Sequence, residues 1–185
     1  FKFGISGAGA LPPHVDNFFA AAGILLLEGY GLTEAAPIVS VRKQQKPVAG
    51  TIGPPIPEIS VKICDPGGNE LPPGKKGVLI VKGPNVMKGY YKKPEETKKV
   101  LSEDGSLNTG DLAMMTIHGE LKIMGREKET IVLMGGENIE PGPIEDIITQ
   151  SEYIDQVVVV GQDRKYLGSL VVPNFEACEE FTKMH

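Results

Sequence analysis

The chain opens with short apolar runs separated by turns of small residues, a pattern typical of an α/β segment. Residues 1–6 alternate apolar and polar side chains, as a half-buried strand does, and residues 7–10 follow as a turn. The prolines at 12–13 predict the first turn of a helix that reaches about Gly23. Residues 23–28 are mostly apolar, which predicts a buried strand. We therefore expect strand, helix and strand in succession.

From residue 50 onward the pattern changes to short alternating runs between glycine and proline turns. Residues 59–63 and 77–81 predict strands, and residues 112–124 predict a hairpin. Residues 94–100 begin with a proline and two acids and end near two lysines, which predicts a short helix aligned with its dipole. Successive short strands of this kind predict antiparallel β structure, either a small barrel or a curled sheet.

The last part of the chain predicts a smaller α+β unit. Residues 129–134 resemble a strand, Gly135 and Gly136 form a turn, and residues 141–151 carry isoleucines on one face, as an amphipathic helix does. Further strands are expected at 157–160 and 169–172, with a last helix starting near Phe175.

Residues 125–138 join the two parts, because dense charge passes there into an apolar run and then into a glycine turn. Two interpretations stay open at this point. The segment is either a charged linker between domains or a joint whose arginine, acids and lysine serve a ligand and a moving domain together.

Composition excludes several classes of protein. With 185 residues, 41% hydrophobic and 23% charged, the chain can bury a core as one large or two small domains. A net charge of −5 and a pI near 5.3 provide no basic field for nucleic acid, so we expect no nucleic-acid partner. Cys64 and Cys178 are far apart and lack metal-ligand spacing, which predicts reduced thiols and no structural zinc.

The apolar runs are too short to span a bilayer, and no basic-then-apolar signal pattern precedes them. These features predict a soluble, cytoplasmic protein, with peripheral membrane contact left open. The chain starts at Phe1 in a strand-like pattern and stops at His185 without a helix stop signal, so we expect a fragment of a longer protein.

Two groups of polar residues are candidates for chemistry. Tyr30, Thr33 and Glu34 lie in a predicted glycine-flanked turn, residues 29–34, after a predicted strand, and strand ends in open α/β sheets are common ligand sites. The alternative is that Thr33 only caps the next segment. Asp111 follows Gly110 and can accept two hydrogen bonds from a sugar diol, or it can cap a turn.

Four motifs occur in an order and at spacings that resemble the adenylate-forming (AMP-binding) superfamily. They are residues 6–10, 30–34, 109–111 and 125–129. The sequence of residues 131–141 resembles that of the long-chain fatty acyl-CoA synthetase branch. The resemblance covers essentially the whole chain.

The resemblance implies a domain organisation. Residues 1–125 would be the C-terminal part of a large N-terminal AMP-binding domain, with an α/β segment at 1–49 and a β-barrel-like part at 50–125. Residues 126–128 would be a hinge, and residues 129–185 the first part of a small, truncated C-terminal domain.

The resemblance also implies an activity, namely that of a long-chain fatty acid–CoA ligase. Such enzymes join a carboxylate to ATP, giving acyl-AMP and pyrophosphate, and then transfer the acyl group to coenzyme A. The family's phosphate loop and its C-terminal lysine are not found in this sequence, so we expect the fragment alone to be inactive. Two alternatives remain: an acyl-AMP ligase that loads a carrier protein, and a non-catalytic nucleotide-binding module.

The resemblance finally implies roles for single residues, with ATP or AMP, Mg²⁺ and coenzyme A as cofactors or co-substrates and a fatty acid as substrate. Candidate catalytic residues are Thr33, Glu34, Arg126 and Lys128. Lys128 would be the hinge. In the nucleotide site, Gly7, Ala8 and Gly9 would line the adenine and acyl pocket, Tyr30 with Gly31 would stack on adenine, and Thr33 would contact a phosphate. Glu34 would bind Mg²⁺, Asp111 would bind the ribose, and Arg126 would contact the ribose or a phosphate. Gly135, Gly136 and Glu137 would form the loop beside the pantetheine path.

Overall fold

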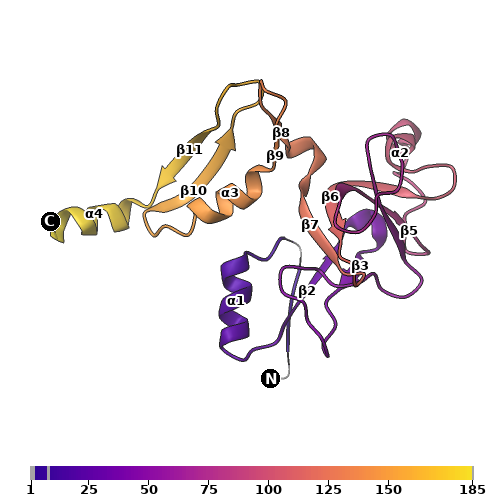
Figure 1. Cartoon of the computed structure of the whole chain (residues 1–185), viewed down its shortest axis with the longest axis horizontal. Coiled ribbons are helices and arrows are strands. Elements are labelled where there is room, and N and C mark those ends of the chain that lie inside the picture. Colours follow the sequence, from indigo (N-terminus) through magenta and orange to yellow (C-terminus); the bar gives the residue numbers. More distant parts are fainter. Residues whose placement is uncertain (1–2, 8, 185) are drawn as a thin grey trace. The chain divides into compact units, whose positions relative to one another are not determined.

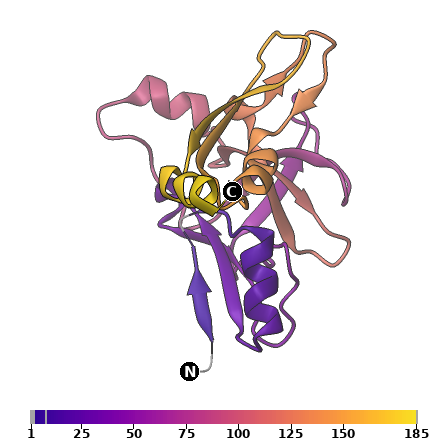
Figure 2. The ribbon, with the colours of Figure 1, turned by 90° about the vertical axis from the view of Figure 1, so that its left-hand side faces the viewer.

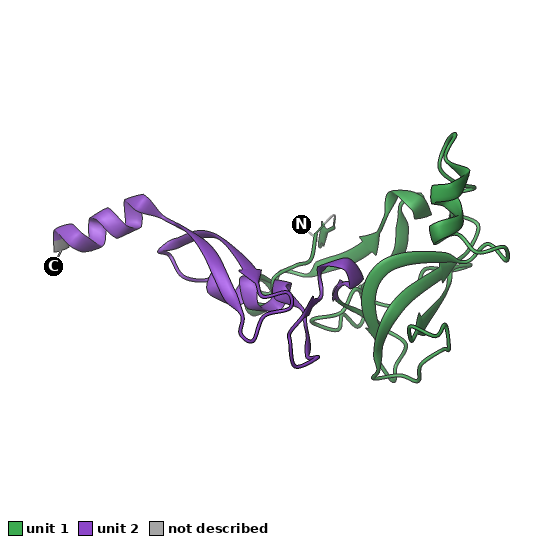
Figure 3. Ribbon diagram, turned by 90° about the horizontal axis from the view of Figure 1, so that it is seen from above, with its two compact units in different colours: residues 1–124 green, residues 125–185 purple. Residues whose placement is uncertain are grey.

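The computed structural model describes residues 3–7 and 9–184 of the chain. The chain divides into two compact units, residues 1–124 and 125–185, which are coloured separately in Figure 3.

The first unit begins with a mixed sheet of strands β1 (Gly4–Ser6), β2 (Leu26–Gly31) and β3 (Ile38–Val41), in that spatial order. Strands β1 and β2 are parallel and are connected through helix α1 (Pro13–Ala21), whereas β2 and β3 are antiparallel. Figures 1 and 2 both show α1 beside β2. The expected strand, helix and strand are present, and β3 was not predicted.

Strand β2 lies later in the sequence than residues 23–28 predict. It runs through Tyr30 and Gly31, which were expected in a turn, because these residues pair with β3, Tyr30 opposite Ser40. A side chain at Gly31 is impossible without a backbone shift, since its Cβ would lie 1.7 Å from the carbonyl oxygen of Pro37. The turn comes afterwards, as the 3-10 turn η1 (Thr33–Ala35).

The rest of the first unit is a four-stranded sheet in the order β4-β5-β6-β7. Among the described residues this sheet stays open at β4 and β7, so the curled-sheet alternative is correct and a closed barrel is wrong. The pairs β4–β5 and β5–β6 are antiparallel. The elements are β4 (Ser60–Cys64), β5 (Lys76–Lys82), α2 (Pro94–Val100), β6 (Leu107–Met115) and β7 (Leu121–Arg126).

One core joins the two sheets of the first unit. Single bridges connect β3 to residues 53–55 and these to β7, through the pairs Ser40–Pro55 and Gly53–Leu121. Ser40 is buried, and its hydroxyl donates to the carbonyl oxygens of Ile52 (2.5 Å) and Gly53 (2.9 Å). The buried apolar cluster is Ala35, Val39, Ile52, Ile59, Ile63, Leu79, Val81, Leu107, Ala113 and Leu121.

The second unit is α+β, as predicted. Its strands β10 and β11 form an antiparallel hairpin, and α3 packs against β10. The expected strand at 129–134 is shorter, because residues 127–129 form a 3-10 turn and only Ile131 and Val132 pair with a partner strand. The elements are η2 (Glu127–Glu129), β8 (Ile131–Val132), β9 (Asn138–Ile139), α3 (Pro141–Ile148), β10 (Ile154–Val160), β11 (Gly168–Pro173) and α4 (Phe175–Met184).

None of the described helices is long and apolar enough to cross a membrane.

Candidate active site

Tyr30 and Asp111 come from different sheets and meet through their side chains. Tyr30 lies on β2, and its hydroxyl donates a short hydrogen bond to Oδ2 of Asp111 on β6. Asp111 is buried, and its backbone N–H donates to Oγ1 of Thr109 (3.1 Å). Gly110 adopts φ of 70°, a left-handed conformation that suits glycine, just before the carboxylate and within β6 where its register with β5 shifts. The fold therefore places an aromatic ring beside an anchored carboxylate.

The η1 turn presents Thr33 and Glu34 directly after β2. Thr33 is exposed and Glu34 is half-buried. The side-chain amide of Asn85 donates to the carbonyl oxygens of Ala35 (2.7 Å) and Ile38 (2.8 Å). The backbone N–H of Met87 donates to the carbonyl oxygen of Glu34 (2.8 Å). The backbone of the turn is therefore fixed by a loop more than forty residues later in the chain.

Tyr90 contacts the carboxylate of Glu34. Its hydroxyl donates a hydrogen bond of 2.8 Å to Oε1, and this bond raises the pKa of Tyr90 above its usual value, with burial adding to the effect. Among the described residues, none donates a hydrogen bond to Oε2 of Glu34. Sequence reasoning missed Tyr90 and Asn85, because nothing local marks partners 47 to 56 positions away.

The residues around η1 fit a magnesium ion that arrives with phosphate groups. The described residues contain no cluster of three or more histidine, cysteine, aspartate or glutamate side chains that could hold a metal alone. Glu34 supplies a single carboxylate with one oxygen unoccupied by hydrogen bonds. Mg²⁺ commonly binds one or two protein carboxylates and takes its other ligands from phosphates and water.

The small-residue turn leaves room beside the backbone. A Cβ at Gly9 would meet no atom within 4 Å, and one at Gly7 would lie 3.6 Å from the carbonyl oxygen of Gly29 on β2. Ala8, also predicted to line the pocket, lies outside the described residues. A flat ligand can therefore approach this backbone closely at Gly9.

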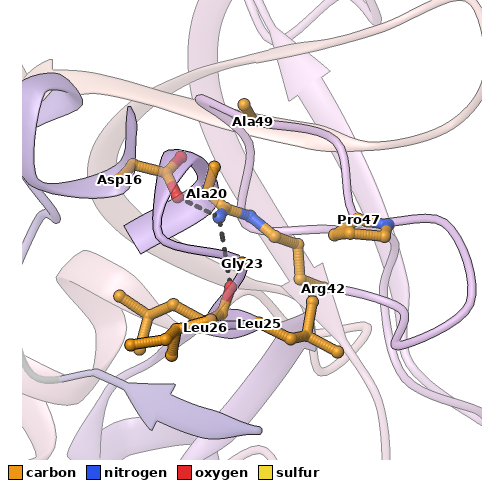
Figure 4. A pocket seen from close by; sticks show the side chains of 9 residues that line it. Asp16, Ala20, Gly23, Leu25, Leu26, Arg42, Pro47 and Ala49 are labelled. Carbon is orange, nitrogen blue, oxygen red and sulfur yellow. Dashed lines mark hydrogen bonds and ion pairs between the residues drawn. The ribbon is translucent and has the colours of Figure 1, made fainter. Parts of the chain in front are cut away.

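Arg42, Asp16 and Glu28 form a buried charged cluster. It connects the end of β3 to α1 and to β2, the strand that carries Tyr30. Arg42 is 3% exposed; its Nη1 lies 2.8 Å from Oδ1 of Asp16, and its Nη2 lies 2.9 Å from Oε2 of Glu28. Figure 4 shows the guanidinium directed at Asp16 and at the carbonyl of Leu26, beside a cavity of about 310 Å³.

The pKa values of the two carboxylates of this cluster shift in opposite directions. Burial raises the pKa of Asp16, but hydrogen bonds from Arg42 and Gly50 and the charge of Arg42 outweigh it and hold that pKa below its usual value. Burial dominates at Glu28 and raises its pKa, although Leu11 and Arg42 oppose the change. The N–H of Leu11 donates to Oε1 of Glu28 (3.0 Å). Glu28 thus connects the segment after the small-residue turn to the strand that carries Tyr30.

The remaining predicted residues belong to the second unit. Arg126 ends β7, whose last two residues lie past the boundary of the first unit at Met124, and its carbonyl oxygen accepts from the N–H of Thr130 (3.2 Å). Lys128 is exposed in η2. Gly135 and Glu137 are exposed on either side of Gly136, whose φ is 87° and whose N–H donates to the carbonyl of Leu133 (2.8 Å). The predicted glycine turn is present.

Known proteins resemble this chain in sequence. The family described as AMP-binding enzyme matches residues 1–91, and the AMP-binding enzyme C-terminal domain matches residues 128–184. A long-chain-fatty-acid–[acyl-carrier-protein] ligase of Arabidopsis thaliana is 48% identical over 96% of this chain and 26% of its own length. A long-chain-fatty-acid–CoA ligase of Escherichia coli is 40% identical over 85% of this chain and 28% of its own. The chain thus spans about a quarter of these relatives.

Solved structures resemble it in fold. ATP-bound MatB from Rhodopseudomonas palustris is 35% identical with a TM-score of 0.79, covering 92% of this chain and 34% of that one. O-succinylbenzoate coenzyme A synthetase from Bacillus subtilis, in complex with ATP and magnesium ion, is 26% identical with a TM-score of 0.80, covering 92% and 36%. The two family matches together cover most of the chain, which therefore belongs to the AMP-binding, or adenylate-forming, enzyme family.

Proposed function

We propose that the protein containing this chain is a long-chain fatty acid–CoA ligase. It would join the fatty acid carboxylate to ATP, releasing pyrophosphate and forming acyl-AMP, and then transfer the acyl group to the thiol of coenzyme A. The observation that carries the proposal is the joint placement of Tyr30 and Asp111, with Glu34 following on the same segment. The names of the relatives support the acid and the ligase chemistry.

The first unit supplies the nucleotide contacts in this proposal. The ring of Tyr30 stacks on adenine, which adds about 1 kcal/mol beyond the area that it buries. Gly7 and Gly9 leave room for the base, and Asp111 accepts hydrogen bonds from the ribose hydroxyls. The exposed hydroxyl of Thr33 donates to a phosphate oxygen.

Glu34 would hold the magnesium ion through its carboxylate. The ion, when bound, neutralises phosphate charge and favours attack of the fatty acid carboxylate at the α-phosphate. The contribution of the chain's own residues is positioning and charge stabilisation, which dominate phosphoryl-type transfers.

In this proposal, residues of the second unit serve the later step, the transfer of the acyl group to coenzyme A. Arg126 adds a cationic fork on the ribose or phosphate side, and Lys128 is the hinge about which a small C-terminal domain turns between two half-reactions. Gly135, Gly136 and Glu137 border the path of the pantetheine arm, where missing side chains leave space. The first unit is then the end of the large domain.

Fatty-acid-dependent exchange of pyrophosphate into ATP tests the adenylation step. We expect exchange by the full-length protein, a large loss in Asp111→Asn and in Glu34→Gln, and none by residues 1–185 alone. Binding of ATP and Mg²⁺ without any exchange by the full-length protein would support a non-catalytic nucleotide-binding module instead.

A second candidate function differs only in the acceptor. The relative that is 48% identical carries the name of an acyl-carrier-protein ligase, so a carrier protein is the alternative thiol. Release of AMP from full-length protein, measured with coenzyme A or with a phosphopantetheinylated carrier protein, separates the two. We propose a cytoplasmic location, which fluorescence microscopy of the tagged full-length protein tests against the chloroplast named for that relative.

A further inference from the structure

The loop of residues 83–90, between β5 and α2, holds the η1 turn through both backbone and side chain. Asn85 and Met87 fix the backbone, as described above. Tyr90 fixes the side chain, because its hydroxyl donates to Oε1 of Glu34 at 2.8 Å. Thr33 and Glu34 are therefore presented by a turn whose shape depends on this loop.

Tyr90 is itself anchored. Its backbone N–H donates to Oγ1 of Thr97 on α2 (2.9 Å), and that hydroxyl donates to the carbonyl oxygen of Lys93 (2.9 Å). Gly89 has φ of 141°, and a Cβ there would lie 2.8 Å from Cγ2 of Thr97, so only glycine lets the chain pass α2 this closely. The phenol therefore approaches Glu34 from a fixed point of the backbone.

We propose that Tyr90 is a positioning residue that orients the Glu34 carboxylate so that Oε2 alone binds the magnesium ion accompanying ATP. This inference rests on the proposed function, in which Glu34 is the magnesium ligand. A glutamate carboxylate turns almost freely about its last torsion, and that freedom is lost when it binds a metal. A hydrogen bond to Oε1 removes part of that freedom beforehand. Partners that orient metal ligands change metal affinity by about 10- to 100-fold.

Tyr90→Phe in the full-length protein tests the proposal. Calorimetric titration of Mg²⁺ into protein saturated with a non-hydrolysable ATP analogue should give a half-saturating concentration about tenfold above that of the wild type. Affinity for the analogue without metal should stay unchanged, because the ring and its backbone anchor remain. The unfolding temperature should fall only slightly, because the lost hydrogen bond joins two partly exposed side chains. A lower unfolding temperature with an unchanged magnesium requirement would assign Tyr90 a structural role and overturn the proposal.

Tyr91→Phe is the matched control. Tyr91 is the next residue, is 85% exposed and contacts the ammonium of Lys92, 5.3 Å from its ring centre. This variant removes the same hydroxyl from the residue next to Tyr90, and the hydrogen bond from Tyr90 to Glu34 stays intact, so no change in magnesium binding is expected. Equal behaviour of Tyr90→Phe and Tyr91→Phe would contradict the positioning role.

Glu34→Gln separates failure of this inference from failure of the proposed function. If Tyr90 acts through Glu34, adding Tyr90→Phe to Glu34→Gln should change magnesium binding no further, whereas additive losses would show an independent effect and overturn the inference. If Glu34→Gln alone leaves magnesium binding unchanged, the metal assignment in the proposed function is wrong, and the inference fails with it.

Discussion

The hydroxyl of Tyr30 donates to the carboxylate of Asp111 across 81 positions of sequence. The bond joins β2 of the first sheet to β6 of the second. A base stacked on the ring and a ribose held by the carboxylate would therefore have a fixed separation. This geometry is the basis of the first prediction.

Tyr30→Phe should weaken ATP binding by the full-length protein about fivefold, because the ring still stacks but no longer holds Asp111. The unfolding free energy should fall by about 1.5–3 kcal/mol, as expected when a hydrogen bond to a buried charged group is lost. Calorimetry and urea unfolding measure the two effects. Unchanged ATP affinity would show that the hydroxyl does not organise the nucleotide site.

Alanine substitutions at Gly31 and Gly9 should have different effects, the first on stability and the second on ATP binding. Gly31→Ala should destabilise the chain, because the new Cβ would lie 1.7 Å from the carbonyl oxygen of Pro37. Gly9→Ala should leave stability unchanged, since its Cβ meets no atom within 4 Å, but should weaken ATP binding by filling the approach to the base. Thermal unfolding with and without ATP distinguishes them. A stable Gly31→Ala variant would be incompatible with this backbone.

Arg42→Met should lower the unfolding free energy by about 3–5 kcal/mol, because two buried carboxylates then lack their cation. Lys43→Met is the control, since Lys43 is the exposed neighbour and its loss should cost less than about 0.5 kcal/mol. Urea unfolding of both variants measures the difference. Similar values for the two would show that the cluster contributes little.

Lys128→Pro should impair thioester formation more than adenylation in the full-length protein, because proline fixes the φ angle at the proposed hinge. Lys128→Ala should spare that step by comparison, since it removes the charge but keeps backbone freedom. Pyrophosphate exchange and coenzyme A-dependent AMP release report the two half-reactions separately. Equal losses in both for Lys128→Pro would argue against a hinge.

Asp104 provides a pH-dependent prediction. Hydrogen bonds from Ser106 and Lys82 lower its pKa from 3.8 to about 2. The folded state therefore binds fewer protons here, so its contribution to stability is present above pH 3.8 and is lost as the pH falls through about 2. Ser106→Ala should raise this pKa more than Lys82→Met does, because Ser106 is the larger cause. Carboxyl NMR titration checks the order, and a larger rise in Lys82→Met would reverse the assignment.

Local patterns predicted much of the fold. The proline and acids before Lys98 and Lys99 located α2 at Pro94–Val100, and alternation located β4 and β5 within a residue or two. Strand β2 was misplaced because its glycines favour a turn locally, while pairing with β3 keeps them extended. Tertiary pairing outweighed local preference there.

The candidate site was predicted only in part. Tyr30 and Asp111 stood out beside glycines, yet no local pattern indicates that they touch. Tyr90 and Arg42 were missed because an aromatic residue in a loop and an arginine after a strand usually face solvent. Their roles arise from partners 56 and 14–26 positions away.

The span between Tyr30 and Asp111 also has a consequence for biosynthesis. Contacts between distant segments form late, since the intervening chain must first be ordered. On the ribosome, β2 emerges well before β6, so a nascent chain that has exposed Tyr30 lacks the carboxylate that completes the pair. In the proposed function, ATP would stabilise the fold through this pair only after Asp111 has emerged, because a ligand favours only states that bind it.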